Sequence, residues 1–312
     1  MKDIKLFYRP DLDGLRALSV LGVIFFHLQI QIGEFVLFKG GFLGVDIFFL
    51  ISGYLMSSLL IKEYFTKKNI CLMNFYERRA RRILPALLLV LCFSSILSYI
   101  FLYPSSLLEY SNSLLSTLGF SSNIYFYLNN LDYNADHSIY KPLLHTWSLS
   151  VEEQFYIIFP IIIYFLLKYF KNYLLIVLLI IFFNIFFIHF IGNLSFSFPY
   201  FEKKFSFYSN SSIFDFYFLT SRLWEFLLGT FIALFSFNVK KNNNFVKILK
   251  ILSIVIIFLS FLFFDESIIH PSFITFLVLV SVSPLIIFNN GESLATNFLS
   301  NKILVKIGLL SY

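Results

Sequence analysis

Long apolar runs, separated by shorter polar segments, dominate the chain. About 20 apolar residues in a helix cross the ~30 Å hydrocarbon core of a bilayer, so these runs predict membrane-spanning helices. They lie near 14–33, 42–61, 83–103, 148–168, 173–191, 216–237, 246–264 and 270–289, and a further run begins near Ile303. We therefore expect an all-α, polytopic transmembrane helix bundle of about eight complete spans plus the start of a ninth, forming one domain over residues 1–312.

Two polar segments interrupt this pattern. Residues 104–147 carry Ser, Asn, Asp and Pro between apolar patches, which predicts a long loop with a short amphipathic or re-entrant helix. Residues 192–215 predict a second long loop. Lys and Arg gather in alternate segments, namely before the first run, in 62–82, and around 168–171 and 240–247. The positive-inside rule therefore predicts a cytoplasmic N-terminus and long loops that face outward.

Composition supports a membrane protein and argues against several other classes. The chain is 58% hydrophobic and 13% charged, with a mean hydropathy of +0.80, whereas a soluble domain is about 25% charged. The net charge of +6 could indicate a nucleic-acid partner, but the basic residues sit mainly in short loops, so we expect the lipid bilayer and no nucleic acid. Cys71 and Cys92 have no metal-site spacing, so no metal is expected.

Charged residues inside the first two runs are candidates for function, because a charge at mid-bilayer costs at least ~2.5 kcal/mol. Arg16 and His27 are eleven residues apart. This spacing is about three helical turns, so both should face one way, roughly 16 Å apart. Asp46 is expected at the depth of His27, where a carboxylate would raise the basicity of the imidazole. The alternatives are a snorkelling arginine, a hydrogen-bonded core histidine and a structural ion pair.

The later runs carry further charged groups. Glu152 and Glu153 are adjacent within an apolar run, and His145 shares a helical face with Glu152 seven residues away. Arg222 and Glu225 are three residues apart, so they could form a self-neutralising pair within one helix. We expect all of these groups in the outer half of the membrane.

Small and basic residues mark two other features. Glycines 40, 41, 44 and 53 flank Asp46, and we interpret them as positions of close helix packing. Four arginines, at positions 78, 79, 81 and 82, precede the third run. Arginine binds phosphate in a bidentate manner, so they could hold a phosphorylated donor on the cytoplasmic side. They could also serve only to set membrane orientation.

Five motifs in this sequence resemble those of the acyltransferase 3 family. The first is an Arg followed by ten residues and a His. The others resemble the family's second-span motif, its Arg-x-x-Arg segment, its most recognisable stretch and a later Arg-Leu-Trp-Glu. They are found, in family order, at Arg9–His27, Gly44–Tyr54, Phe75–Pro85, Leu144–Tyr156 and Arg222–Glu225.

The resemblance, in the branch of O-antigen and peptidoglycan O-acetyltransferases, implies a multi-pass protein of the bacterial inner (plasma) membrane. It would move an acetyl or other acyl group from cytoplasmic acyl-CoA to a hydroxyl of a cell-surface carbohydrate such as O-antigen of lipopolysaccharide. Arg16, His27 and the Arg-x-x-Arg element are implicated in this activity across the family. Two registers of that element fit, Arg78 with Arg81 and Arg79 with Arg82.

The resemblance and the predicted depths together give the expected roles. His27 is a general base or an acyl carrier, oriented by Asp46, and the catalytic set also holds Arg16, Glu152 and Glu153. The donor acyl-CoA would bind Arg16 and the four arginines at 78, 79, 81 and 82. The carbohydrate acceptor would meet His145, Trp147, Arg222 and Glu225.

The sequence leaves two alternatives to this enzyme. A transporter or flippase for a polysaccharide or small molecule would also need intramembrane charges around a cavity. The family's Gly-x-x-Ser-Tyr segment, matched here at 308–312, runs on into a further span, and some members add a soluble SGNH-type domain. An inactive truncated fragment is therefore the second alternative.

Overall fold

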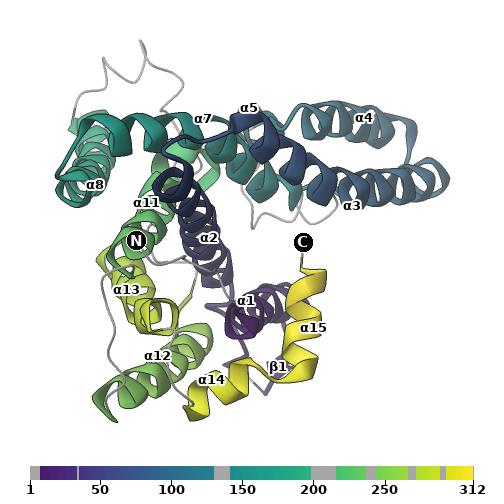
Figure 1. Cartoon of the computed structure of the whole chain (residues 1–312). Helices are drawn as coiled ribbons and strands as arrows, with labels where there is room; N and C mark the ends of the chain where they lie inside the picture. The colour runs from purple at the N-terminus through teal and green to yellow at the C-terminus, as the bar shows by residue number, and fades with distance from the viewer. Residues whose placement is uncertain are drawn as a thin grey trace. The chain divides into compact units, whose positions relative to one another are not determined.

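The computed structural model describes residues 8–33, 35–129, 141–197, 216–236, 244–265, 272–288 and 293–311 (Figure 1). The chain divides into two compact units, and each is described by itself. The first unit holds Met1–Lys68, Leu166–Phe182 and Trp224–Tyr312. The second unit holds Asn69–Phe165 and Phe183–Leu223.

Helices make up nearly all the described secondary structure. In the first unit these are α1 (Pro10–Leu28), α2 (Leu43–Lys67), α12 (Asn244–Phe263), α13 (Phe273–Ile287), α14 (Leu294–Leu299) and α15 (Lys302–Leu310), with the hairpin strands β1 (Gln31–Ile32) and β2 (Phe35–Val36). The second unit holds α3 (Leu72–Phe101), α4 (Pro104–Leu118) and α5 (Ser122–Leu128). Both units contain parts of α7 (Thr146–Tyr169), α8 (Tyr173–Ser197) and α11 (Leu219–Ser236).

The helices confirm the all-α class, because each predicted apolar run falls on a helix. Four of them, α2, α3, α7 and α12, are long and apolar enough to cross a membrane, and α13 and the 173–188 part of α8 are shorter apolar helices. The number of eight spans stays a prediction. Within the described residues 104–129, the chain forms the two helices α4 and α5, where the sequence predicts one short helix. Residues 130–140, and 198–215 of the second predicted loop, lie outside the described residues.

The first predicted span is too long at its C-terminal end. The helix α1 ends at Leu28 rather than near residue 33, because Gln29 adopts the left-handed conformation (φ 45°) and its N–H bonds the carbonyl of Phe26. The chain then enters the antiparallel hairpin, with Gln31 opposite Val36. A helix commonly ends at such a left-handed residue, but the apolar residues that follow hide this end from a hydropathy pattern.

Glycines bring helix backbones of the first unit into contact. A Cβ built at glycine 14, 40, 41, 44, 53, 229 or 308 would overlap a backbone carbonyl of a neighbouring segment, so no other residue fits there without a shift of the backbone. This confirms the packing interpretation of the glycines around Asp46. The pairs, with the distance from the Cβ to the carbonyl oxygen, are Gly44–Ser19 (2.3 Å), Gly53–Phe226 (2.2 Å), Gly229–Leu50 (2.2 Å), Gly14–Leu299 (1.8 Å) and Gly308–Asp13 (1.8 Å).

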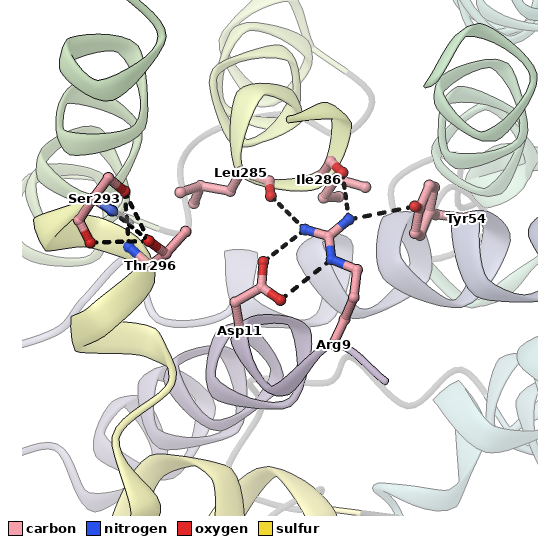
Figure 2. A network of polar contacts seen from close by, with 7 residues as sticks. All are labelled: Arg9, Asp11, Tyr54, Leu285, Ile286, Ser293 and Thr296. Atoms are coloured by element: carbon pink, nitrogen blue, oxygen red, sulfur yellow. Dashed lines mark hydrogen bonds and ion pairs between the residues drawn. The ribbon is translucent and has the colours of Figure 1, made fainter. Parts of the chain in front are cut away.

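A buried arginine joins three helices of the first unit (Figure 2). Arg9 forms an ion pair with Asp11 (2.6 Å) and donates from Nη1 and Nη2 to the carbonyls of Ile286 (2.6 Å) and Leu285 (2.9 Å) at the end of α13. It also contacts the hydroxyl of Tyr54 in α2. The last carbonyls of a helix have no partner within it, so Arg9 satisfies them and complements the helix dipole.

A helix start is also capped in this region. The side chains and backbone N–H groups of Ser293 and Thr296 exchange hydrogen bonds in a capping box at the start of α14 (Figure 2). Such reciprocal bonds satisfy two of the N–H groups that a helix start leaves open, which fixes where α14 begins.

The second unit is built on one face of α3. Phe75, Arg79, Ile83, Leu87 and Leu91 recur every four residues and are all buried, as expected for one stripe of a helix. Leu87 and Leu91 pack with Tyr110 of α4 and with Leu143. Hydroxyl groups join the neighbouring helices α4, α5 and α7 through bonds between Thr117, Thr146, Ser122 and Ser150.

Gly229→Ala tests the glycine contacts. The added methyl group would lie 2.2 Å from the Leu50 carbonyl oxygen, and overpacking costs about 1–3 kcal/mol or more. We expect a lower unfolding temperature in mild detergent. The matched control is Gly119→Ala, whose Cβ would come no closer than 3.6 Å to other atoms. Equal unfolding temperatures for the two variants would contradict this packing.

Candidate active site

Two glycines set how α1 and α2 face each other. A Cβ on Gly44 would lie 2.3 Å from the carbonyl oxygen of Ser19, and one on Gly41 would lie 2.1 Å from that of Gly22. Going from Gly41 forward to Gly44 therefore corresponds to going from Gly22 back to Ser19 along α1. This antiparallel register places Asp46 opposite about residue 17, the neighbour of Arg16.

Arg16 and Asp46 are both deeply buried, with 3% and 2% of their surface exposed. The guanidinium carbon of Arg16 lies 5.8 Å from the ring centroid of Phe48, and its Nη1 lies 3.9 Å from a carboxylate oxygen of Asp13. The Arg16 cation and the Asp46 anion therefore lie at the same height along the packed helices α1 and α2. A buried charge is costly unless an opposite charge is nearby.

His27 lies elsewhere on α1, in its last turn, where it is exposed. The register puts it about ten residues, or ~15 Å of helix rise, beyond the level of Asp46. The expectation that His27 and Asp46 share one depth is therefore not met. The physical reason is that α1 ends at Leu28, so that the strands β1 and β2 and the turns at 37–42 precede α2.

Arg79 is the buried member of the basic segment. It lies on the buried stripe of α3 with 8% of its surface exposed. Its guanidinium carbon is 4.4 Å from the ring centroid of Tyr156 and 5.9 Å from that of Phe75. Arginine over an aromatic face contributes about 0.5–2 kcal/mol, more where water is excluded.

Two glutamates of α7 lie with Arg79 and Tyr156, and we call these four residues the Arg79 cluster. The Tyr156 hydroxyl donates a hydrogen bond to the Glu152 carboxylate. Glu153 is buried, with 9% of its surface exposed, and lies within electrostatic reach of Arg79 and Glu152. The cluster therefore gathers one cation, two carboxylates and a phenol, which can hold or move a proton.

The other three arginines of the segment differ from Arg79. Arg78, Arg81 and Arg82 are exposed, and Arg81 forms an ion pair with Glu77 one turn away. These three arginines lie one to three residues away from the positions of the buried stripe of α3, which recur every four residues, so their side chains leave the helix on other faces. Of the two Arg-x-x-Arg registers, only Arg79 with Arg82 includes a buried arginine.

A second arginine of this unit also rests on aromatic rings. Arg222 lies 5.1 Å from the ring centroid of Phe216 and 5.8 Å from that of Trp147, and its Nε donates to the Phe216 carbonyl (3.2 Å). His145 lies in the turn before α7 and keeps exposed surface. Neighbouring atoms desolvate its ring, which lowers the pKa of His145 below its usual value.

The remaining predicted residue is Glu225, which is fully buried and belongs to the first unit. Arg16, His27, Asp46 and Glu225 therefore lie in the first unit, and the other predicted site residues lie in the second. Within the described ranges, no group of three or more His, Cys, Asp or Glu residues could hold a metal ion.

Sequence reasoning missed the role of Tyr156. A signal was present, because Tyr156 follows Glu152 by four residues, the spacing at which helical side chains meet. The burial of Arg79 could also have been found, since Phe75, Ile83, Leu87 and Leu91 share its four-residue period.

Comparison with known proteins connects this site with a family. The sequence model of the acyltransferase 3 family, described as "Acyltransferase domain", matches residues 9–312. O-acetyltransferase OatA of Staphylococcus aureus, in strains NCTC 8325 / PS 47 and COL, is 44% identical over 164 residues, which are 53% of this chain and 26% of OatA. Another Staphylococcus aureus protein, SAS0844 of strain MSSA476, is 41% identical over 168 residues, which are 54% of this chain and 27% of that protein.

These matches have a limited extent. The aligned region spans about a quarter of the length of the curated relatives. No solved structure matches the chain.

Arg79→Gln tests the Arg79 cluster. Arg79 and Glu153 are both buried and lie within electrostatic reach of each other, and removing one of two such opposite charges costs about 3–5 kcal/mol, because the other charge stays buried. We therefore expect a marked fall in unfolding temperature in detergent, and recovery of most of it when Glu153→Gln is added. The control Arg81→Gln changes a side chain that is 79% exposed and should have little effect. A double variant no more stable than Arg79→Gln would contradict the coupling.

Proposed function

Because the chain belongs to the acyltransferase 3 family, we propose that it transfers an acetyl or other acyl group from cytoplasmic acyl-CoA to a hydroxyl of a cell-surface carbohydrate. The observation that carries this proposal is the family match over residues 9–312. The matched region includes the exposed His27 and the buried Arg16, both on α1. The 44% identity to O-acetyltransferase OatA supports acetyl as the group transferred.

His27 is the proposed general base. Its imidazole takes the proton of the sugar hydroxyl while the hydroxyl oxygen forms a bond to the acyl carbonyl carbon. The bond from that carbon to the sulfur of the donor then breaks, and the sulfur leaves as a thiolate that takes up a proton. Exposure of His27 at the end of α1 supports this role, because both substrates must reach the imidazole. A histidine that carries the acyl group is the alternative.

Arg16 of the first unit and the exposed arginines of the second unit are each proposed to act on the donor. Phosphate groups first meet charges that water can reach, which suits Arg78, Arg81 and Arg82. Arg16 is buried roughly 16 Å along α1 from His27, and it acts on the donor path from inside the helix packing. Asp46 then balances the charge of Arg16 rather than orienting His27.

The aromatic support of Arg222 belongs to the acceptor side of the proposal, whereas Arg79 lies among Arg78, Arg81 and Arg82 on α3 and belongs with the donor. Glu152 and Glu153, beside Arg79, are proposed to act in the transfer step, where a carboxyl group can hold or move a proton. His145 precedes α7 and Trp147 lies in its first turn against Arg222, and both are assigned to the acceptor surface. Glu225 contributes a buried carboxylate in the first unit.

The proposed location is the bacterial inner (plasma) membrane, with the N-terminus in the cytoplasm. The distribution of Lys and Arg supports this orientation. O-antigen of lipopolysaccharide and peptidoglycan are the first acceptors to assay, because both carry free sugar hydroxyls at the cell surface.

A cell-based assay tests the proposed activity. The chain is expressed in a host that lacks surface O-acetylation, and ester-linked acetate is released by mild alkali from purified polysaccharide and quantified. We expect acetate with the unmodified chain and a loss of about 10²-fold or more with His27→Ala, since a general base contributes 10²–10⁴-fold.

The control for this assay is Lys67→Gln, which changes a side chain that is 66% exposed and belongs to no proposed site. It should keep the acetate of the unmodified chain. Equal acetate with His27→Ala would rule out His27 as the base. Surface export of a carbohydrate without any acetate would favour a transporter.

A further inference from the structure

A cavity of about 350 Å³ lies within the second unit, apart from the Arg79 cluster. The walls come from the end of α3, one face of α4, the aromatic side chains of α5 and the segment at Lys141. Figure 1 shows α3, α4 and α5 close together in this part of the chain. Pockets for small molecules span roughly 300–1,000 Å³, so the cavity has room for a short ligand such as one or two sugar rings.

The helix α4 is amphipathic with its polar face turned inward. Tyr110, Ser113 and Thr117 are buried, whereas Leu108 and Leu115 are each 66% exposed. This is the reverse of a water-soluble helix, whose apolar face turns toward the core. It suits a helix that presents leucines to lipid and hydroxyl groups to a polar cavity.

The polar part of the lining has no unbalanced charge. Glu109 and Lys141 both line the cavity and form an ion pair with each other. A phosphate-bearing ligand needs a net positive site, so the cavity is poorly suited to acyl-CoA. Ser106 and the Glu109 carboxylate add hydrogen-bonding groups that suit a neutral ligand with many hydroxyls.

Aromatic rings supply the apolar part of the lining. Tyr110, Tyr125 and Phe126 border the cavity. The Tyr110 hydroxyl is held by Ser94 and Ser95, both at 2.9 Å, and the Tyr125 hydroxyl donates to the Glu109 carbonyl (3.2 Å). These bonds fix the two tyrosine rings in place before a ligand arrives. Phe126 and Tyr110 are buried, so the half-buried Tyr125 ring offers the main flat surface to the C–H faces of a sugar.

We propose that this cavity binds a neutral sugar unit of the carbohydrate acceptor. This assignment rests on the proposed function, because a bound sugar is an acceptor only if the chain transfers an acyl group to it. The sugar packs against the aromatic rings, and the Glu109–Lys141 pair and Ser106 bond its hydroxyl groups.

Cysteine protection tests the cavity directly, without acyl transfer. Ser106→Cys is made in the full chain with Cys71→Ser and Cys92→Ser, and the purified protein is labelled with a water-soluble thiol reagent. The probes are chitotriose, maltotriose and neutral oligosaccharides released from the host's surface polysaccharide. At ten times the dissociation constant of a sugar, mass action leaves about one site in eleven open, so labelling should slow about tenfold.

Three variants and one further probe make the result specific. Ser105→Cys, at an exposed position that does not line the cavity, should show no protection. Glu109→Gln should abolish protection of Ser106→Cys, whereas Glu77→Gln, an exposed residue on α3, should not. Coenzyme A should give no protection.

Several outcomes would overturn the inference. Protection by coenzyme A would assign the cavity to the donor. Absence of protection by all the oligosaccharides, or failure of the reagent to reach Ser106→Cys at all, would exclude a sugar site. Protection by sugar in a chain that transfers no acetate would keep the cavity and overturn the acyl-transfer proposal instead, so the two failures are distinguishable.

Discussion

Backbone contact at glycines is the constraint on which the first unit depends. Where a side chain is absent at Gly41 and Gly44, the backbone that leads into α2 touches the carbonyls of α1. This contact sets the register of the two helices and therefore which polar groups meet. It places Asp46 at the level of Arg16 and His27 about ten residues further along, in the last turn of α1. The same type of contact joins α1 to α14 and α15, so the helix that carries His27 is held on several sides.

Buried arginines show how the chain keeps charge inside an apolar protein. Arg9 lies against a carboxylate and the last carbonyls of α13. Arg16, Arg79 and Arg222 each lie near an aromatic face. An isolated buried charge is very costly, and these partners lower that cost while the guanidinium stays charged. Each unit therefore holds fixed positive groups within its apolar packing.

Hydropathy predicted the helices well, because burial in lipid demands continuous apolar runs whatever their tertiary contacts. It could not predict where α1 ends, since Gln29 breaks the helix inside a stretch that stays apolar on average. The depth of Asp46 was then misjudged, because depth was counted from the ends of runs rather than from helix contacts. By contrast, the burial of Arg79 follows a four-residue period of buried positions on α3, which the sequence already contains. The buried polar residues of α4 follow a period of three to four residues, which the sequence contains as well.

The central proposal is that this chain transfers an acyl group from a cytoplasmic donor to a carbohydrate on the other side of the membrane. The most direct measurement uses proteoliposomes of the purified chain with radiolabelled acetyl-CoA sealed inside and surface polysaccharide outside. The account predicts label on the external polysaccharide as an alkali-labile ester, and none with His27→Ala. Label that stays inside the vesicles, or polysaccharide that crosses the membrane without acquiring label, would contradict it.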